Sequence, residues 1–269
     1  MPTATVLFHG SLNDFLPPSR RGVAMPYRLR GGPTIKDVIE ALGVPHPEVD
    51  LILAGGRAVD FRHRLASDDR IEVFGLDRPT QSRRSAGSGL VPDTPQPPRF
   101  ILDGHLGRLA RYLRLLGFDA RYDNRAADEE LARLSAAEIR ILLTRDRGLL
   151  KRSIVRLGYL VRGDDPRRQL DEVAGRYGLA RLAAPFSRCV RCNGLLELVD
   201  RSQVAESLAG EPRTLRYFDS FGRCVECGSI YWQGSHFERM SRLVSQVVHD
   251  GPVIGDNRPE VEARTEGSR

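Results

Sequence analysis

The chain carries aspartates at a repeated position, at or just after the end of four short apolar runs in its middle third. These aspartates are Asp103, Asp123, Asp146 and the neighbouring pair Asp164 and Asp165. Strands of a parallel sheet end along a common edge, and open α/β sheets bind ligands outside the carboxyl ends of their strands. Carboxylates gathered there repel one another unless a cation lies between them, and Mg²⁺ prefers such oxygen ligands. The spacing therefore predicts a metal-dependent enzyme that acts on phosphate esters.

Asp103 and Asp146 are the first candidates for metal ligands. Each lies between an apolar strand and the start of a helix, and Asp103 can also cap the helix that begins near Leu106. Asp128 and Glu129 open the next predicted helix, where the helix dipole alone favours acidic residues. A helix that begins near the same edge can also direct one of these two acids toward the metal, so both remain candidates.

Two further acidic positions allow a structural as well as a catalytic interpretation. Asp123 is either an acid at the edge or a turn former together with Asn124. Asp164 and Asp165 precede Pro166, so one of the pair is expected to cap the following helix. Asp164 is retained as a further catalytic candidate.

All four cysteines lie in two Cys-x-x-Cys pairs, Cys189 with Cys192 and Cys224 with Cys227. Two such pairs supply four thiolates with the spacing of a tetrahedral Zn²⁺ site. Disulfide bonds are the alternative, but no secretion signal indicates an oxidising compartment. Four cysteine ligands leave no open coordination position, so the predicted zinc is structural and stabilises a small ribbon fold.

Residues 99–178 alternate between predicted strands and helices, which indicates a parallel sheet with right-handed crossovers. Leucines from Leu106 to Leu116 recur at helical spacing, and Arg108, Arg111 and Arg114 lie away from that stripe. This pattern predicts an amphipathic helix with a basic outer face. Further helices are expected at about residues 128–138, 147–156 and 166–177.

Changes in composition divide the chain into successive units. Residues 1–77 have the pattern of a small α+β unit, and residues 78–98, rich in Arg, Ser, Gly and Pro, are predicted to form a disordered linker. The α/β unit spans residues 99–183 and the cysteine module residues 184–241. A flexible tail is expected over residues 242–269, which contain few apolar side chains.

The formal net charge is +6, and arginine supplies nearly all of the positive charge. A basic chain favours a polyanionic partner, such as RNA. No apolar run approaches the ~20 residues that span a bilayer, and the N-terminus has no pattern of a signal peptide. We therefore expect no membrane partner and a cytoplasmic location.

Six segments resemble the Mut-seven C-terminal RNase family, over about residues 99–240. They are Phe100–Arg114, Asp128–Leu131, Ile141–Asp146, Leu160–Asp165, Pro185–Cys189 and Tyr231–His236. The resemblance implies an α/β fold in which a PIN-like parallel-sheet nuclease domain is followed by a zinc ribbon. It also implies that Mg²⁺ or Mn²⁺ is held by Asp103, Asp128 and Asp146. The glutamate that ordinary PIN domains carry on an early helix has no evident counterpart.

Residues 1–77 resemble a ubiquitin-like β-grasp fold of the sulfur-carrier type. The resemblance rests on Thr34–Val38, Ala54–Phe61 and Asp69–Phe74. Sulfur carriers end in Gly-Gly at a free C-terminus, whereas this segment continues through Leu76 into the linker. The resemblance therefore implies recruitment of a protein partner or docking of RNA rather than conjugation.

These features together predict a metal-dependent ribonuclease, in which Arg108, Arg111, Arg145 and Arg147 contact the RNA backbone. The alternative is a non-catalytic RNA-binding adaptor that has a structural zinc ribbon and an acidic cluster without a catalytic role. The two hypotheses differ in their use of divalent metal. Cleavage requires it, whereas an adaptor binds RNA with a salt-dependent affinity that is indifferent to Mg²⁺.

Overall fold

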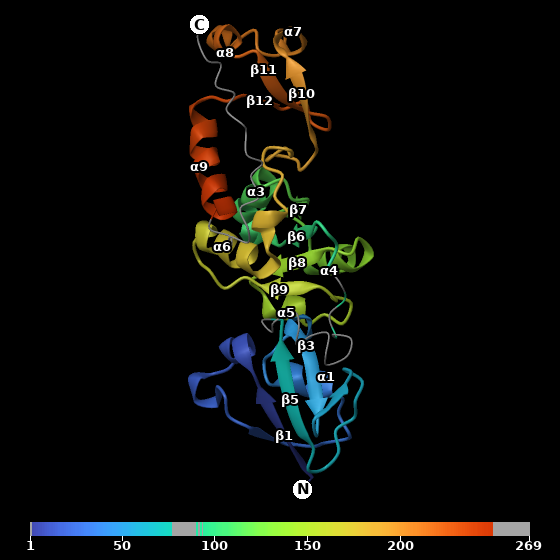
Figure 1. Ribbon diagram of the computed structural model, residues 1–269. Helices are drawn as coiled ribbons and strands as arrows, with labels where there is room; N and C mark the ends of the chain where they lie inside the picture. Colours follow the sequence, from blue (N-terminus) through green and yellow to red (C-terminus); the bar gives the residue numbers. More distant parts are fainter. Residues whose placement is uncertain (1, 77–89, 91, 93, 250–269) are drawn as a thin grey trace, which may run out of the picture.

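The computed structural model describes residues 2–76, 90, 92 and 94–249 (Figure 1). Three units follow one another along the molecule in chain order, with the N-terminal unit at one end and the cysteine module at the other. Most of the linker predicted for residues 78–98 lies outside the described residues. None of the described helices is long and apolar enough to cross a membrane.

A five-stranded mixed sheet forms the N-terminal unit, with the strand order β2-β1-β5-β3-β4. β1 and β5 pair in parallel at its centre, and the other neighbours are antiparallel. This arrangement agrees with the β-grasp fold expected from the sequence. The strands are β1 (Thr3–Phe8), β2 (Met25–Arg28), β3 (Val49–Ala54), β4 (Arg57–Val59) and β5 (Arg70–Gly75).

Helix α1 (Ile35–Ala41) contributes Val38 and Ile39 to the core of this unit. The Thr34 side chain accepts the N–H of Asp37, and the Asp37 carboxylate accepts the N–H of Thr34, which together form a capping box. This reciprocal pair fixes the point at which the helix begins. Three 3₁₀ helices complete the unit: η1 (Gly10–Phe15), η2 (Pro18–Arg20) and η3 (His46–Glu48).

The middle unit contains the parallel sheet that the alternating pattern predicts, with the strand order β7-β6-β8-β9. After β7 the chain returns past β6 to form β8, so the direction of strand addition reverses between β6 and β8. Such a topological switch point leaves a crevice outside the carboxyl ends of the strands. The strands are β6 (Phe100–Leu102), β7 (Ala120–Tyr122), β8 (Ile141–Thr144) and β9 (Gly158–Leu160).

The helices of the middle unit follow the strand ends and pack on the sheet. The helix expected at residues 147–156 is shorter in the structure, because it ends at Leu150 and two turns follow. These turns bring Val155 into the core that faces the N-terminal unit. The helices are η4 (Gly104–Leu106), α3 (Gly107–Leu115), α4 (Asp128–Ala137), α5 (Arg147–Leu150), α6 (Pro166–Tyr177) and η5 (Leu179–Arg181).

The N-terminal and middle units share one apolar core. Ile101 and Leu142 of the parallel sheet face this core, whereas Phe100 and Leu143, their neighbours along the strands, face a second core on the opposite side. The second core includes the apolar face of α3 and of α6. The middle unit further supplies the shared core with Leu149, Leu150, Val155 and Leu160.

The cysteine module is a three-stranded antiparallel sheet of β10 (Leu196–Asp200), β11 (Ser220–Cys224) and β12 (Ile230–Tyr231). The segment between β10 and β11 holds two short helices, α7 (Arg201–Val204) and α8 (Pro212–Tyr217). Its small core is separate from the other two and contains Val199, Val204, Leu208 and Phe221, with Trp232 packed against it.

Helix α9 (Ser235–His249) corrects the expectation of a flexible tail from residue 242. It returns from the cysteine module and lies against the middle unit (Figure 1). Leu243, Val244 and Val247 are buried in the second core, which supplies the apolar contacts that hold residues 242–249 in a helix. Residues 250–269 lie outside the described residues.

Candidate functional site

Asp103 and Asp146 follow two strands that lie side by side. Leu102 at the end of β6 pairs with Leu143 of β8, and the Asp103 N–H donates to the Leu143 carbonyl at 3.2 Å. The two aspartates therefore lie at the same edge of the sheet, at the switch point between β6 and β8. We call the carboxyl ends of β6, β8 and β9, with Asp103, Asp146 and Asp164, the acidic edge.

Thr144 connects the two aspartates, and sequence reasoning did not select it. Its buried hydroxyl donates to Oδ2 of Asp103 and accepts the N–H of Asp146 at 2.9 Å. The N–H of Arg145 donates to the same Asp103 oxygen at 3.1 Å. The spacing Thr-x-Asp at the end of a strand is the signal that identifies such a residue.

Both aspartates also cap a helix. Oδ1 of Asp103 accepts the N–H of His105 at 2.9 Å, and Oδ1 of Asp146 accepts the N–H of Gly148 at 2.6 Å. Asp103 is only 6% exposed, whereas Asp146 is exposed to solvent. Because each carboxylate oxygen offers two lone pairs, capping leaves acceptor capacity for a cation.

Asp128 and Glu129 are exposed at the start of α4, which follows β7 and packs against β6 and β8. The structure does not bring them into a closed cluster with Asp103 and Asp146. Among the described residues, only the four cysteines form a group of three or more His, Cys, Asp or Glu side chains placed to share an ion. The role of the acidic residues as metal ligands therefore stays a prediction.

The remaining aspartates at the strand ends have local partners. Asp123 accepts the N–H of Arg125 at 2.9 Å and so acts as a turn former. Asp164 forms an exposed ion pair with Arg145 across the ends of β8 and β9. Asp165 caps α6, as expected for one member of the pair before Pro166.

The arginines of α3 divide into two groups. Arg108 and Arg111 are exposed, as predicted, but Arg114 is 5% exposed and does not belong to a basic outer face. Its guanidinium donates to the carbonyl of Ala120 at 2.8 Å and to that of Arg191 at 2.9 Å. The Arg114 side chain therefore lies between β7 and the first Cys-x-x-Cys pair of the cysteine module, and both accept its hydrogen bonds.

The four cysteines form a compact cluster, with their sulfur atoms within 4.8 Å of one another. The Sγ atoms of Cys189 and Cys227 are 3.7 Å apart, and those of Cys192 and Cys224 are 3.4 Å apart. Four sulfurs held ~2.3 Å from a tetrahedral zinc ion lie about 3.8 Å from one another. The cluster therefore has the donor set and spacing to bind structural zinc.

Hydrogen bonds favour the thiolate form at two of these positions. The Ser229 hydroxyl and N–H lower the pKa of Cys227 to about 6. Burial opposes ionisation of Cys189, but the Tyr231 hydroxyl and the Cys192 N–H lower its pKa below the ordinary value. Thiolates are the form of cysteine that binds metal.

Asn193, which directly follows the first Cys-x-x-Cys pair, connects the cysteine module to the middle unit. Its side chain accepts the N–H of Ala120 at 2.9 Å and donates to Asp119 at 2.8 Å. Asp119 also forms a bidentate pair with Arg140, at 2.7 and 3.0 Å. Burial opposes ionisation of Asp119, but the hydrogen bonds from Arg140 and Asn193 lower its pKa to about 2, so that it remains charged at neutral pH.

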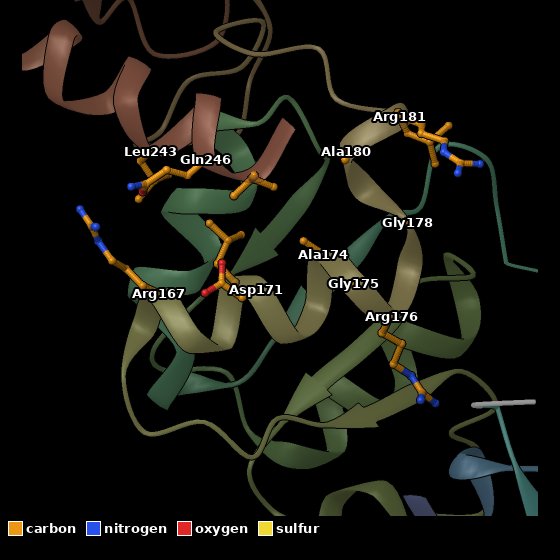
Figure 2. A pocket seen from close by; sticks show the side chains of 13 residues that line it. Arg167, Asp171, Ala174, Gly175, Arg176, Gly178, Ala180, Arg181, Leu243 and Gln246 are labelled. Carbon is orange, nitrogen blue, oxygen red and sulfur yellow. The ribbon is translucent and has the colours of Figure 1, made fainter. Parts of the chain in front are cut away.

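A groove of about 950 Å³ lies between α6, η5 and α9 (Figure 2). Arg167 lies at one end of it and Arg176 and Arg181 at the other, so their guanidinium groups do not converge on one point. Neither Asp103 nor Asp146 lines this groove. It therefore adds nothing to the candidate catalytic centre.

Comparison with known families agrees with this architecture. A family model described as the Mut7-C RNAse domain matches residues 98–244, and one described as Mut7-C ubiquitin matches residues 1–81. No curated protein and no solved structure gives a significant match. Because the first match covers more than half of the sequence, the chain belongs to the Mut7-C RNase domain family.

Proposed function

We propose that the protein is a metal-dependent ribonuclease that hydrolyses RNA phosphodiester bonds at the acidic edge. The observation that carries this proposal is the pairing of Asp103 and Asp146 at a topological switch point, connected through Thr144. Carboxylate oxygens are the donors that Mg²⁺ and Mn²⁺ prefer. Membership of the RNase domain family supports a nuclease role.

The residues of the edge have separate roles in this proposal. Asp103, Asp146 and Asp128 would hold the ion, which lowers the pKa of a bound water and stabilises negative charge on the phosphate. Thr144 holds the Asp103 carboxylate in place. Arg108, Arg111, Arg145 and Arg147, all exposed, would bind phosphates of the RNA strand without reading its sequence. Glu129 and Asp164 are secondary candidates.

Cleavage of single-stranded RNA by the purified protein with Mn²⁺ tests the proposal. Asp146→Asn should abolish cleavage, because an amide is a far weaker ligand for a hard cation. We expect at least a 100-fold loss of rate, in line with the ~10²–10⁴-fold effect of single catalytic groups. Asp171→Asn, an exposed acid on α6 away from the edge, is the matched control. Equal rates for both variants would assign the cleavage to a contaminant.

An RNA-binding adaptor is the second candidate, and one observation favours it. The described acids do not close into a group of three that shares an ion. An adaptor binds RNA with an affinity that falls with salt and does not change on addition of Mg²⁺ or Mn²⁺. Binding measured by fluorescence anisotropy at fixed ionic strength, with and without Mn²⁺, separates the candidates when combined with the cleavage assay.

The cysteine cluster supports a structural zinc ion rather than a catalytic one. Four thiolates occupy all the positions of a tetrahedral site, so no position remains for water or substrate. RNA as a partner and a cytoplasmic location belong to the same proposal.

A further inference from the structure

The N-terminal unit is fixed in one orientation on the middle unit. Beyond the shared apolar core, several polar contacts cross the junction. Lys151 Nζ donates to the Glu40 carbonyl at 2.7 Å, His46 Nε2 lies 2.8 Å from the Val155 carbonyl, and the N–H of Leu160 donates to Glu48 at 2.8 Å. Directional bonds inside a packed interface define one docked position, so the unit is not a freely swinging attachment.

The η1 segment of the N-terminal unit reaches the loops of the acidic edge. Phe15, at the end of η1, is 4% exposed. Its carbonyl accepts a hydrogen bond from Nη1 of Arg147 at 3.3 Å, and its ring centroid lies 5.4 Å from the guanidinium carbon of that residue. The guanidinium carbon of Arg162 lies 5.1 Å from the same ring. One aromatic side chain therefore contacts two cationic side chains.

Arg162 is held chiefly by rings. Its guanidinium carbon lies 5.6 Å from the Tyr159 ring as well as close to Phe15, and Nη1 donates to the Tyr159 hydroxyl at 3.3 Å. The Asp14 carboxylate is 4.0 Å from Nη1. Nη2 is buried and has no hydrogen-bond partner among the residues that the structure describes. Loss of the Phe15 ring would therefore remove a main restraint on this side chain.

Both arginines lie close in sequence to aspartates of the acidic edge, Arg147 at the start of α5 and Arg162 in the loop after β9. Arg147 directly follows Asp146, and Arg162 lies two residues before Asp164, whose carboxylate pairs with Arg145. We propose that Phe15 is a positioning residue that holds Arg147 and Arg162 for contact with the RNA backbone, so that the ubiquitin-like unit forms one wall of the substrate site. This inference rests on the proposed function only in taking the acidic edge as the place where RNA binds.

The physical reason is preorganisation. A free arginine side chain loses rotamer freedom when it binds a phosphate, and a guanidinium already stacked on an aromatic face loses less. Sequence patterns give no sign of this contact, because Phe15 and Arg162 are 147 positions apart and belong to different units. Of the two roles expected for the N-terminal unit, recruitment of a protein partner or docking of RNA, this inference takes the second and assigns it to a specific side chain.

Binding of a fluorescently labelled single-stranded oligouridylate tests the inference without cleavage. The full chain carries Asp146→Asn to prevent hydrolysis, and Phe15→Leu is added to remove the ring while keeping apolar volume. We expect about a fivefold loss of affinity, the size of one to two cation–π contacts. The slope of log affinity against log salt should also fall by about 1, as for one lost phosphate contact. A merely structural effect would not change this slope.

Tyr27→Leu is the matched control, because it removes a ring from β2, an edge strand of the same unit. In the cleavage assay on the chain without Asp146→Asn, Phe15→Leu should raise KM about fivefold and leave kcat within twofold, since cation–π contacts are small.

Circular dichroism checks folding, and Phe15→Met replaces the leucine variant if that one unfolds, because methionine fills the same space flexibly. Affinity and salt slope equal to those of Tyr27→Leu would overturn the inference. Absence of cleavage by the wild-type chain would overturn the proposed function alone, because the binding comparison still decides the role of Phe15.

Discussion

The middle unit is joined to its two neighbours by different kinds of contact. At the N-terminal junction, apolar side chains of both units form one continuous core, and Glu48 is buried within it, 1% exposed. At the junction with the cysteine module, called the ribbon below, side-chain hydrogen bonds connect the first Cys-x-x-Cys pair to the middle unit. They involve Arg114 and Asn193 with Asp119. Apolar contact on that side comes from α9 (Figure 1) and from Phe186 and Val190, which pack against the second core.

The carboxylates of the two junctions show the same difference. Burial raises the pKa of Glu48 above its ordinary value, although Arg176 and the Leu160 N–H oppose the rise. Asp119 is partly buried, which opposes its ionisation, yet the hydrogen bonds from Arg140 and Asn193 lower its pKa to about 2. The first junction is thus stabilised mainly by removal of apolar surface from water, and the second by hydrogen bonds to charged groups. We infer that the N-terminal and middle units unfold together, whereas the ribbon is a separately stabilised module.

Removal of the zinc ion proposed for the four cysteines should have the largest effect, and it should be confined to the ribbon. Structural zinc contributes ~10–16 kcal/mol in isolated zinc peptides, and the small core of the ribbon cannot replace it. Trp232 is the single tryptophan of the chain and packs on that core, so its fluorescence reports the ribbon alone. A chelator, or Cys224→Ser, should shift its emission to longer wavelength.

The same experiment tests the separation of the two junctions. Far-ultraviolet circular dichroism in urea follows mainly the N-terminal and middle units, and its midpoint should change little when zinc is removed. Cys224→Ser without added chelator provides the comparison for nonspecific effects of the chelator. Simultaneous loss of both signals would show that the ribbon and the middle unit unfold as one block.

The parallel sheet of the middle unit was predictable from the sequence, because strands and helices alternate along residues 99–178 and the short apolar runs end in aspartates. That pattern also placed Asp103 and Asp146 at one edge, although their action as metal ligands stays a prediction. The paired Cys-x-x-Cys motifs likewise predicted the cysteine cluster that the structure contains. These features need only residue type and spacing, which a single sequence supplies.

Contacts between units were not predictable in the same way. Arg114 lies outside the leucine stripe of α3, as an exposed residue would, but the ribbon covers it. The apolar residues of α9 are few, so the sequence alone does not predict an ordered segment. They are buried because the second core of the middle unit packs against them. Phe15 contacts Arg147 and Arg162, and only the fold brings these residues close.

Glu48→Gln should have the second largest effect, at the N-terminal junction. Gln keeps the shape and the acceptor for the Leu160 N–H, but it leaves the Arg176 guanidinium, 3.2 Å away, without its ion pair. Removal of one partner of a buried ion pair costs about 3–5 kcal/mol. Urea denaturation should therefore show a lower free energy of unfolding, in a single transition for both units.

The double variant Glu48→Gln with Arg176→Met separates the pair from its surroundings. Replacement of both charges by groups of similar size removes the unpaired cation, so we expect recovery of at least half of the lost stability. Two separate transitions in the single variant would contradict the shared core. A loss below about 0.5 kcal/mol, the range of exposed pairs, would show that Glu48 is not held as a buried partner.

Asn193→Gly should have the smallest effect, at the ribbon junction. The backbone of Asn193 has a φ of 77°, which glycine adopts without strain, so the substitution removes the side-chain bonds to Ala120 and Asp119 alone. Loss of these bonds should cost about 1–2 kcal/mol, because one of them involves a charged acceptor. The apparent zinc affinity, measured by competition with a chelator, should fall about tenfold, since 1.4 kcal/mol corresponds to that factor.

Arg223→Ala, which breaks an exposed ion pair with Glu197 inside the ribbon, should leave that affinity nearly unchanged. Equal zinc affinity in wild-type and Asn193→Gly chains would mean that docking on the middle unit does not stabilise the ribbon, and that its metal alone determines whether it folds.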